Sequence, residues 1–234
     1  MKNGKTGKVK YVPIEVVREK AGILLAEKYG LKKIQIIPTI LEKSFEKAEE
    51  RLETVKDLTS WIQIDVIDGK FVYGKSFELE LVKRMDVDIK ENLLDIHLLV
   101  NQPARWINKC KFVNASRIIG QVEMMSDREE FVKMVKDGEM EAGLAYDIDT
   151  KIDRDIPTET DVVLLMGRKA GFGEYEFNEK VLGKIKLLKQ IRDDEKIRFK
   201  IAVDGGVNTD NIKLLEEAGV DIVYSGKYFE ELIK

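Results

Sequence analysis

The stretch WIQIDVI, residues 61–67, decides how this sequence folds. It is apolar at almost every position, and Gln63 and Asp65 are the exceptions. A nearly continuous apolar run of this length is typical of a strand buried on both faces, as in a parallel sheet covered by helices. The chain carries further runs of the same kind: IQIIP (34–38), LLDIHLLV (93–100), SRIIGQV (116–122), EAGLAYD (141–147), DVVLLM (161–166), RFKIAVD (198–204) and VDIVYSG (220–226).

Charged segments with helical periodicity separate these runs. They include residues 45–58, 77–85, 128–138, 179–195 and 211–219. The helix after the fifth run, at TKIDRDIPTET (150–160), is expected to be short or irregular. Strand candidates that alternate with helices at the βα repeat length, with no Pro/Ser-rich linker between them, predict one closed (β/α)8 barrel, a TIM barrel, over residues 34–234.

The amino-terminal extension, residues 1–33, is expected to contain an additional helix. Apolar side chains from Ile14 to Leu25 recur at helical spacing, and Gly30 is a natural stop. This helix would cap the lower end of the barrel or serve a subunit contact. The basic opening MKNGKTGKVK resembles the start of a signal peptide, but charged residues interrupt the segment that follows, so we expect neither a signal core nor a membrane span.

Composition limits the classes of partner. Hydrophobic residues make up 44% and charged residues 35% of the 234 positions, as expected for a soluble globular protein with a charged surface. The formal charge of −3 and the isoelectric point near 5.6 provide no general basic field, so nucleic acid is not an expected partner. Cys110 is the sole cysteine, which excludes an intrachain disulfide and favours a reducing, cytoplasmic setting.

Polar residues interrupt the apolar runs where a barrel carries its chemistry, near the carboxyl ends of the strands. They are Gln63 and Asp65 in the second run, His97 in the third and Asp204 at the end of the seventh. Gln63 and Asp65 are two residues apart and therefore share the interior face. Two carboxylates and an imidazole in one mouth would bind a divalent metal or act as an acid/base pair. Each residue alone also has a structural explanation, such as a hydrogen-bonded core histidine.

Glycines follow the last strands of the predicted barrel. Gly171 and Gly173 come after the sixth run, Gly205 and Gly206 after the seventh, and Gly226 after the eighth. Loops at these places, where backbone N–H groups approach a ligand closely, form the phosphate cradle of many such barrels. Any one of them is also explained as an ordinary tight turn. Together they indicate a phosphate site.

Five blocks of sequence resemble the ribulose-phosphate 3-epimerases in order and spacing. They are PTIL (38–41), WIQIDVIDGKFV (61–72), LDIHLLVNQPARWI (94–107), VVLLMGRKAGFGEYEF (162–177) and VDGGVNTDNI (203–212). The match extends from about residue 34 to residue 229 and leaves out the amino-terminal helix. The blocks DVxDGxFV, LDxHL and VDGGV are jointly specific for this family.

The resemblance implies an activity and a set of roles. In this family two aspartates exchange protons on opposite faces of carbon 3 of a pentulose 5-phosphate. An enediolate forms between the two proton transfers, and a divalent metal held by two histidines and the same aspartates stabilises it. Asp65 and Asp204 would be the acid/base pair and, with His97, metal ligands for zinc or a harder ion such as manganese, iron or magnesium. The protein would be a homo-oligomer. The substrate and phosphate would contact Thr39, Gly171, Phe172, Gly173, Gly205, Gly206, Gly226 and Lys227.

Departures from the family pattern keep other functions open. Gln63 stands where the family has its first histidine ligand, and an amide oxygen is a poorer zinc ligand, so the metal site would be weakened, altered or lost. Glu174 replaces the second glycine of the sixth loop, and Lys227 replaces a serine. The alternatives are a non-catalytic or repurposed sugar-phosphate-binding barrel, and an epimerase or isomerase for another phosphosugar.

Overall fold

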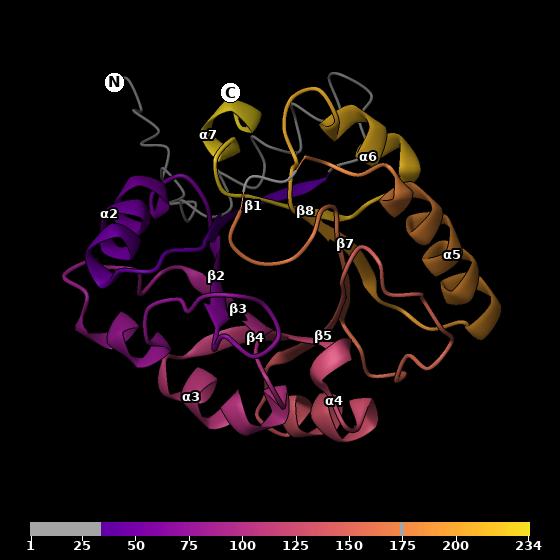
Figure 1. The fold of residues 1–234 in the computed structure, drawn as a ribbon, viewed down its shortest axis with the longest axis horizontal. Coiled ribbons are helices and arrows are strands. Elements are labelled where there is room, and N and C mark those ends of the chain that lie inside the picture. Colours follow the sequence, from indigo (N-terminus) through magenta and orange to yellow (C-terminus); the bar gives the residue numbers. More distant parts are fainter. Residues whose placement is uncertain (1–33, 174–175) are drawn as a thin grey trace, which may run out of the picture. The chain divides into compact units, whose positions relative to one another are not determined.

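The computed structural model describes residues 34–173 and 176–234. Its strands are parallel and close into a barrel, in which each strand pairs with the next along the chain and β8 pairs with β1 (Figure 1). The eight predicted strands are all present, which confirms the (β/α)8 fold class. They are β1 (Gln35–Ile40), β2 (Trp61–Ile67), β3 (Leu93–Leu99), β4 (Ala115–Gln121), β5 (Glu141–Tyr146), β6 (Val162–Met166), β7 (Lys200–Asp204) and β8 (Ile222–Ser225).

Helices lie around the outside of this barrel (Figure 1). The side chains of Ser44 and Asp127 cap the amino ends of α2 and α4, and so fix where these helices begin. The α-helices are α2 (Phe45–Val55), α3 (Ile107–Phe112), α4 (Arg128–Lys136), α5 (Lys180–Glu195), α6 (Ile212–Ala218) and α7 (Phe229–Leu232). The 3-10 helices are η1 (Leu79–Arg84), η2 (Pro103–Trp106) and η3 (Val122–Met124).

Two connections differ from a regular βα repeat. The helical pattern at residues 77–85 forms the 3-10 helix η1, whose buried Leu79 and Val82 are three positions apart and so share one face of a three-residue turn. Residues 147–161, between β5 and β6, form turns and bends without a helix. The short or irregular helix expected after the fifth run is therefore absent, and the chain passes from β5 to β6 without one. The helix expected at residues 14–29 of the 1–33 extension lies outside the described residues.

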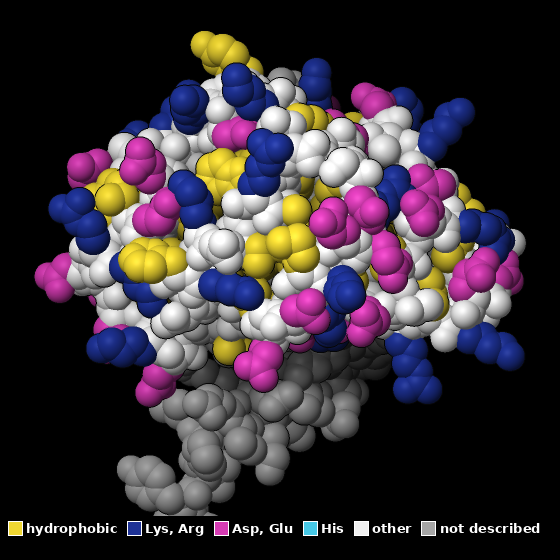
Figure 2. Space-filling view, turned by 90° about the horizontal axis from the view of Figure 1, so that it is seen from below, with side chains coloured by type: hydrophobic (Ala, Val, Ile, Leu, Met, Phe, Trp, Pro, Cys, Tyr) yellow, Lys and Arg dark blue, Asp and Glu magenta, His cyan; other side chains and the backbone are white. Residues whose placement is uncertain are grey.

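The surface of the described part is charged. On the face shown in Figure 2, basic and acidic side chains are interspersed. This pattern agrees with a formal charge close to zero for so many ionisable residues. No helix in the described part of the chain combines the length and the apolar composition that a membrane span needs.

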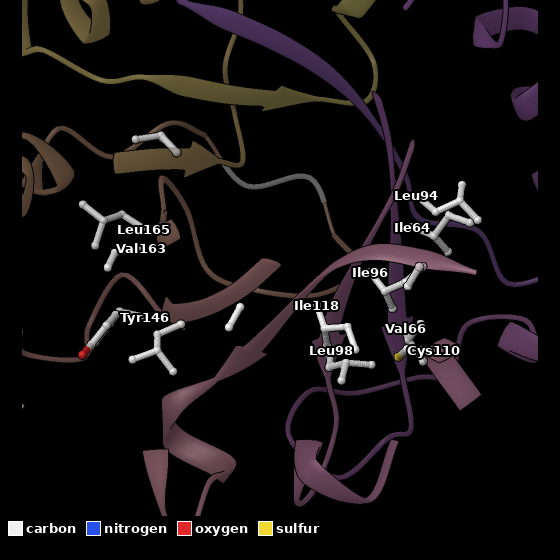
Figure 3. Packing of buried hydrophobic residues seen from close by; sticks show 14 of the residues in the cluster. Ile64, Val66, Leu94, Ile96, Leu98, Cys110, Ile118, Tyr146, Val163 and Leu165 are labelled. Atoms are coloured by element: carbon white, nitrogen blue, oxygen red, sulfur yellow. The ribbon is translucent and has the colours of Figure 1, made fainter. Parts of the chain in front are cut away.

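The larger apolar core lies between the barrel and its helices. Ile62, Ile64 and Val66 of β2 belong to it, together with the outward-facing residues of the other strands and the inner faces of α2–α6. Figure 3 shows part of this layer, where Cys110 of α3 lies beside Val66 and Leu98. Because these alternate residues of β2 face outward, Gln63 and Asp65 face the barrel interior.

The barrel interior is filled by side chains over most of its depth. One layer is apolar and includes Ile37, Ile119 and Leu164. A polar group adjoins it: the buried Arg117 guanidinium donates to Asp95 (2.9 Å) and also contacts Tyr224, Glu141 and the ring of Trp61. This pairing satisfies a charge that would otherwise be costly to bury. The filled interior leaves the carboxyl ends of the strands for a ligand.

Candidate active site at the carboxyl ends of the strands

Asp65, His97 and Asp204 meet at one end of the barrel. The parallel register of β2 and β3 sets Asp65 opposite His97, and Asp204 is the last residue of β7. His97 Nδ1 lies 2.9 Å from Asp65 Oδ1 and 4.0 Å from Asp204 Oδ2. One potential ligand atom from each side chain lies within 4.8 Å of the other two. Three groups that are far apart in the sequence therefore surround a space of the size that one metal ion needs.

Burial controls the protonation of this cluster. Exposed fractions are 4% for Asp65, 0% for His97 and 5% for Asp204. Burial, together with the negative charge of Asp65, raises the pKa of Asp204 to about 7. Burial by itself would lower the pKa of His97, but the hydrogen bond to Asp65 and the surrounding carboxylate charges outweigh it, and the pKa is raised. Near neutral pH the cluster therefore holds a carboxyl group that can gain or lose a proton.

The second ring nitrogen of His97, Nε2, contacts the side chain of Gln121, the last residue of β4. The two side chains are 3.0 Å apart at His97 Nε2. Sequence analysis missed Gln121, although it interrupts an apolar run as Gln63 does. Its side chain is fully buried and lies within reach of Glu123 of η3. The imidazole is thus held from both sides.

Gln63 lies fully buried in the interior, with neither side-chain polar atom hydrogen-bonded to any described residue. It occupies the register position between Thr39 of β1 and Asp95 of β3. A buried amide without partners costs free energy of about 1–3 kcal/mol for each unsatisfied group. Such a group is retained most readily where a water, an ion or a substrate completes it.

Thr39 was predicted to contact the substrate. Its hydroxyl Oγ1 lies 3.3 Å from Asp65 Oδ2 and donates to it. It also lines the cavity described next. Its position therefore allows contact with a ligand and orients the Asp65 carboxylate.

A cavity of about 960 Å³ opens beside the cluster. Asp65 and Asp204 reach its wall, whereas His97 and Gln63 are fully buried. A space of this size can take a small sugar phosphate. Every residue that was predicted to contact substrate or phosphate lines it: Thr39, Gly171, Phe172, Gly173, Gly205, Gly206, Gly226 and Lys227.

The loop after β7 needs its glycines. Gly205 and Gly206 adopt φ angles of 101° and 74°, in the region that other residues rarely occupy. A Cβ atom on Gly206 would also lie 2.9 Å from the backbone of Phe177. The backbone of this loop can therefore follow its tight path beside the cavity only with glycine at these positions.

Basic side chains line the cavity near these loops. Arg51 of α2 donates through Nη2 to the carbonyl of Gly226 (2.7 Å) and pairs with Glu230 of α7. Arg168 donates through Nη1 to the carbonyl of Gly171 (3.1 Å). Sequence analysis missed Arg51, because its helix carries many exposed charges and nothing in their spacing marks this one. The contacts show that both arginines hold ligand-facing loops in place. Glu174, the acidic departure from the family pattern, lies outside the described residues.

An apolar cluster lies next to the acidic group. Ile67, Leu99, Met166 and Ala170 are its buried members, and Phe172 is one of the residues that pack against them. These side chains exclude water and lower the local dielectric, which strengthens electrostatic interactions at Asp65 and Asp204. Ile67 and Leu99 contribute apolar volume here.

The donors at this site fit a divalent metal. Two carboxylates and an imidazole are ligands that zinc, manganese and iron accept, and they converge at the spacing given above. The unpartnered amide of Gln63, two residues before Asp65 in β2, carries a further buried oxygen. Each donor is nearly or fully buried, so a bound cation would be paired with charge in a site of low dielectric.

Comparison with known proteins agrees with this arrangement. A family model described as "Ribulose-phosphate 3 epimerase family" matches residues 35–229 of this chain. Ribulose-phosphate 3-epimerase of Bacillus subtilis is 29% identical over 197 residues, covering 82% of this chain and 90% of the relative. The enzyme of the same name from Mycobacterium tuberculosis is 26% identical over 193 residues, covering 82% and 83%.

A solved structure with a similar fold is that of KGPDC from Streptococcus mutans. It has a TM-score of 0.61 and 14% sequence identity, and the comparison covers 83% of this chain and 88% of that chain. This likeness concerns the barrel alone. The match to the family model shows more than the fold. It extends from β1 to the start of α7 and includes Asp65, His97 and Asp204. The chain therefore belongs to the ribulose-phosphate 3-epimerase family, whose members are isomerases.

Proposed function

We propose that this protein is a ketose-phosphate 3-epimerase that interconverts D-ribulose 5-phosphate and D-xylulose 5-phosphate. The observation that supports this most is the convergence of Asp65 and Asp204 on one buried point at the mouth of the cavity. Epimerisation at carbon 3 needs one group to remove a proton from one face and another to return a proton to the opposite face. Two carboxyl groups from β2 and β7 meet this requirement.

The reaction proceeds by two proton transfers. One carboxylate removes the proton from carbon 3, and the electron pair moves onto the carbonyl oxygen at carbon 2 to give an enediolate. The other carboxyl group, in its acid form, then returns a proton to the opposite face of carbon 3. Without a metal, burial and the charge of Asp65 raise the pKa of Asp204 to about 7, so both of its forms are accessible at neutral pH. A bound cation would favour the carboxylate, the form that removes a proton.

Asp65, His97 and Asp204 would hold the divalent metal, with Gln63 as a weaker fourth ligand. When bound, the metal would supply positive charge near the developing oxyanion. Thr39 orients the Asp65 carboxylate through its hydroxyl. The apolar cluster of Ile67, Leu99, Met166 and Ala170 excludes water from the reacting carbon.

The phosphate would lie at the glycine-rich loops after β6, β7 and β8. Backbone N–H groups at Gly205, Gly206 and Lys227 would contact it, and the side chains of Lys227 and Arg168 would add positive charge. These basic residues also distinguish this cavity from one for an uncharged sugar. The protein would act in the cytoplasm as a homo-oligomer, as the family resemblance implies.

A second function, sugar-phosphate binding without catalysis, is favoured by one observation. An amide occupies position 63, where the family has an imidazole ligand, and so weakens the expected metal site. A related activity on another phosphosugar would use the same acid/base pair. Both alternatives predict ligand binding, and they differ in what happens to carbon 3 of ribulose 5-phosphate.

The test measures conversion and binding in the same buffer, with zinc or manganese added. We expect wild-type protein to convert ribulose 5-phosphate. The Asp65→Asn and Asp204→Asn variants should lose about 100- to 10,000-fold in kcat while still binding it, the usual contribution of a proton-transfer group. Asp149→Asn, at an exposed site after β5, is the matched control and should behave as wild type. Binding without conversion by wild-type protein would contradict the epimerase and favour the binding function.

A further inference from the structure

The orientation of the Gln121 amide is determined by its neighbours. With the amide nitrogen toward Glu123 and Ala145, it donates to Glu123 Oε2 (2.7 Å) and to the carbonyl of Ala145 (3.3 Å), and the amide oxygen accepts from His97 Nε2 (3.0 Å). The reverse orientation sets the amide oxygen against two other oxygens. Acceptors on one side therefore direct the Gln121 oxygen to the histidine.

We propose that Gln121 and Glu123 form a positioning relay that keeps the proton of His97 on Nε2 and presents Nδ1 to the metal. The relay rests on the metal site of the proposed function. A neutral imidazole has one protonated nitrogen and one free lone pair, and only the latter binds a metal. The Gln121 oxygen can only accept, so it requires a proton on Nε2 and leaves the lone pair of Nδ1 for the cation.

The relay is anchored beyond the histidine. The other carboxylate oxygen of Glu123, Oε1, accepts from the backbone N–H of Asp147 (2.8 Å). The carboxylate oxygen Oδ1 of Asp147 in turn accepts from the N–H of Ala170 (3.1 Å), which precedes the ligand-facing Gly171. Because Glu123 meets a main-chain donor at Oε1, it cannot turn away from Gln121 without losing a bond. The chain of contacts also joins the metal site to the loop after β6.

The first test removes the acceptor. Gln121→Met keeps the size of the side chain but takes away both polar groups. We expect zinc to bind about 10- to 100-fold more weakly, the usual effect of removing an outer hydrogen-bond partner of a histidine ligand. Titration calorimetry measures this, and circular dichroism checks that the variant is folded. Gln190→Met, at an exposed site of α5, makes the same chemical change elsewhere and should leave zinc affinity unchanged.

The second test inverts the relay without changing the size of a side chain. In Glu123→Gln, the new amide must keep an oxygen toward the Asp147 N–H, so its NH₂ group faces Gln121. The Gln121 amide is then expected to turn over and direct its own NH₂ group to His97 Nε2. Such a donor opposes a proton on Nε2, so we again expect weaker zinc binding of about 10- to 100-fold.

Nuclear magnetic resonance shows directly which ring nitrogen of His97 carries the proton, because His97 is the only histidine in the sequence. With ¹⁵N-labelled histidine, the zinc-loaded wild type should show one protonated ring nitrogen, Nε2, with a downfield proton. That proton should move upfield or disappear in Gln121→Met and in Glu123→Gln. A wild-type signal and wild-type zinc affinity in both variants would overturn the relay alone. Failure of the wild type to bind zinc would overturn the relay and the proposed metal site together.

Discussion

In the proposed metal site, single residues would decide how strongly a cation binds. His97 contacts Asp65 on one side and Gln121 on the other, so its ring has little freedom to turn. Gln63, by contrast, is buried with both polar atoms unpartnered among the described residues. The proposed metal site thus has one ligand, His97, that is firmly held, and one position, Gln63, where an imidazole would be a stronger ligand.

Replacing Gln63 with histidine should raise zinc affinity. An imidazole nitrogen is a stronger zinc ligand than an amide oxygen, and we expect a gain on the order of tenfold or more, about 1.4 kcal/mol for each tenfold. Calorimetric titration of Gln63→His beside Gln190→His, an exposed control on α5, measures the change. Equal affinity in Gln63→His and wild type would contradict the assignment of position 63 as a ligand position.

The sequence indicates most of the site residues by one signal. A polar residue inside an apolar run must be satisfied or functional, and this reasoning found Gln63, Asp65, His97 and Asp204. The same signal was present at Gln121 and was overlooked. Arg51 could not be found in this way, because its contact with Gly226 depends on how α2 lies beside the end of β8.

Loops after the strands shape the end of the cavity where we propose that the phosphate binds. The turn after β7 depends on positive φ angles at Gly205 and Gly206. The loop after β8 is held from outside, because Arg51 binds the carbonyl of Gly226 and pairs with Glu230 of α7. Contacts from α2 and α7 thus support the loop after β8.

Two glycine substitutions should have opposite effects. Gly206→Ala places a Cβ 2.9 Å from the Phe177 backbone at a φ of 74°, and we expect a loss of about 1–3 kcal/mol in the free energy of unfolding and weaker phosphosugar binding. Gly183→Ala, in α5 with nothing within 4 Å of the new Cβ, should gain about 0.5–1 kcal/mol. Denaturant unfolding and ligand titration measure both; tight binding retained by Gly206→Ala would contradict the role of this loop.

At this scale sequence reasoning placed the strands well and the connections less well. Buried strands have a strong apolar signal that does not depend on distant contacts. Whether residues 77–85 form an α-helix or a 3-10 helix depends on how Leu79 and Val82 pack against the barrel, which the sequence does not show. The helix expected after β5 is absent, and the segment there contains Pro157, which a helix interior does not tolerate.

One continuous apolar core joins the strands of the barrel to the helices around them. Cys110 of α3 belongs to that core and is fully buried beside residues of β2 and β3 (Figure 3). Burial raises the pKa of its thiol to about 12. The reactive thiolate is therefore scarce near neutral pH, and reagents cannot reach the sulfur while the barrel is closed.

Cys110 should report the unfolding of the barrel. We expect the native protein to resist a thiol reagent such as 5,5′-dithiobis(2-nitrobenzoate) at pH 8, and one thiol per chain to react when denaturant unfolds it. Absorbance of the released thiolate and far-ultraviolet circular dichroism should give the same transition midpoint. Stoichiometric labelling of protein that keeps its native spectrum would contradict the packing of α3 described above.

In the proposed mechanism the barrel brings Asp65 and Asp204 to opposite faces of one carbon atom, and proton exchange tests this proposal most directly. In D₂O with a divalent metal, wild-type protein should place deuterium at carbon 3 of ribulose 5-phosphate and form xylulose 5-phosphate labelled at the same carbon. Asp65→Asn and Asp204→Asn should each abolish formation of labelled xylulose 5-phosphate, and Asp149→Asn should not. Wild-type protein that binds the sugar phosphate without deuterium at carbon 3, or labelled product formed at the wild-type rate by either variant, would contradict the account.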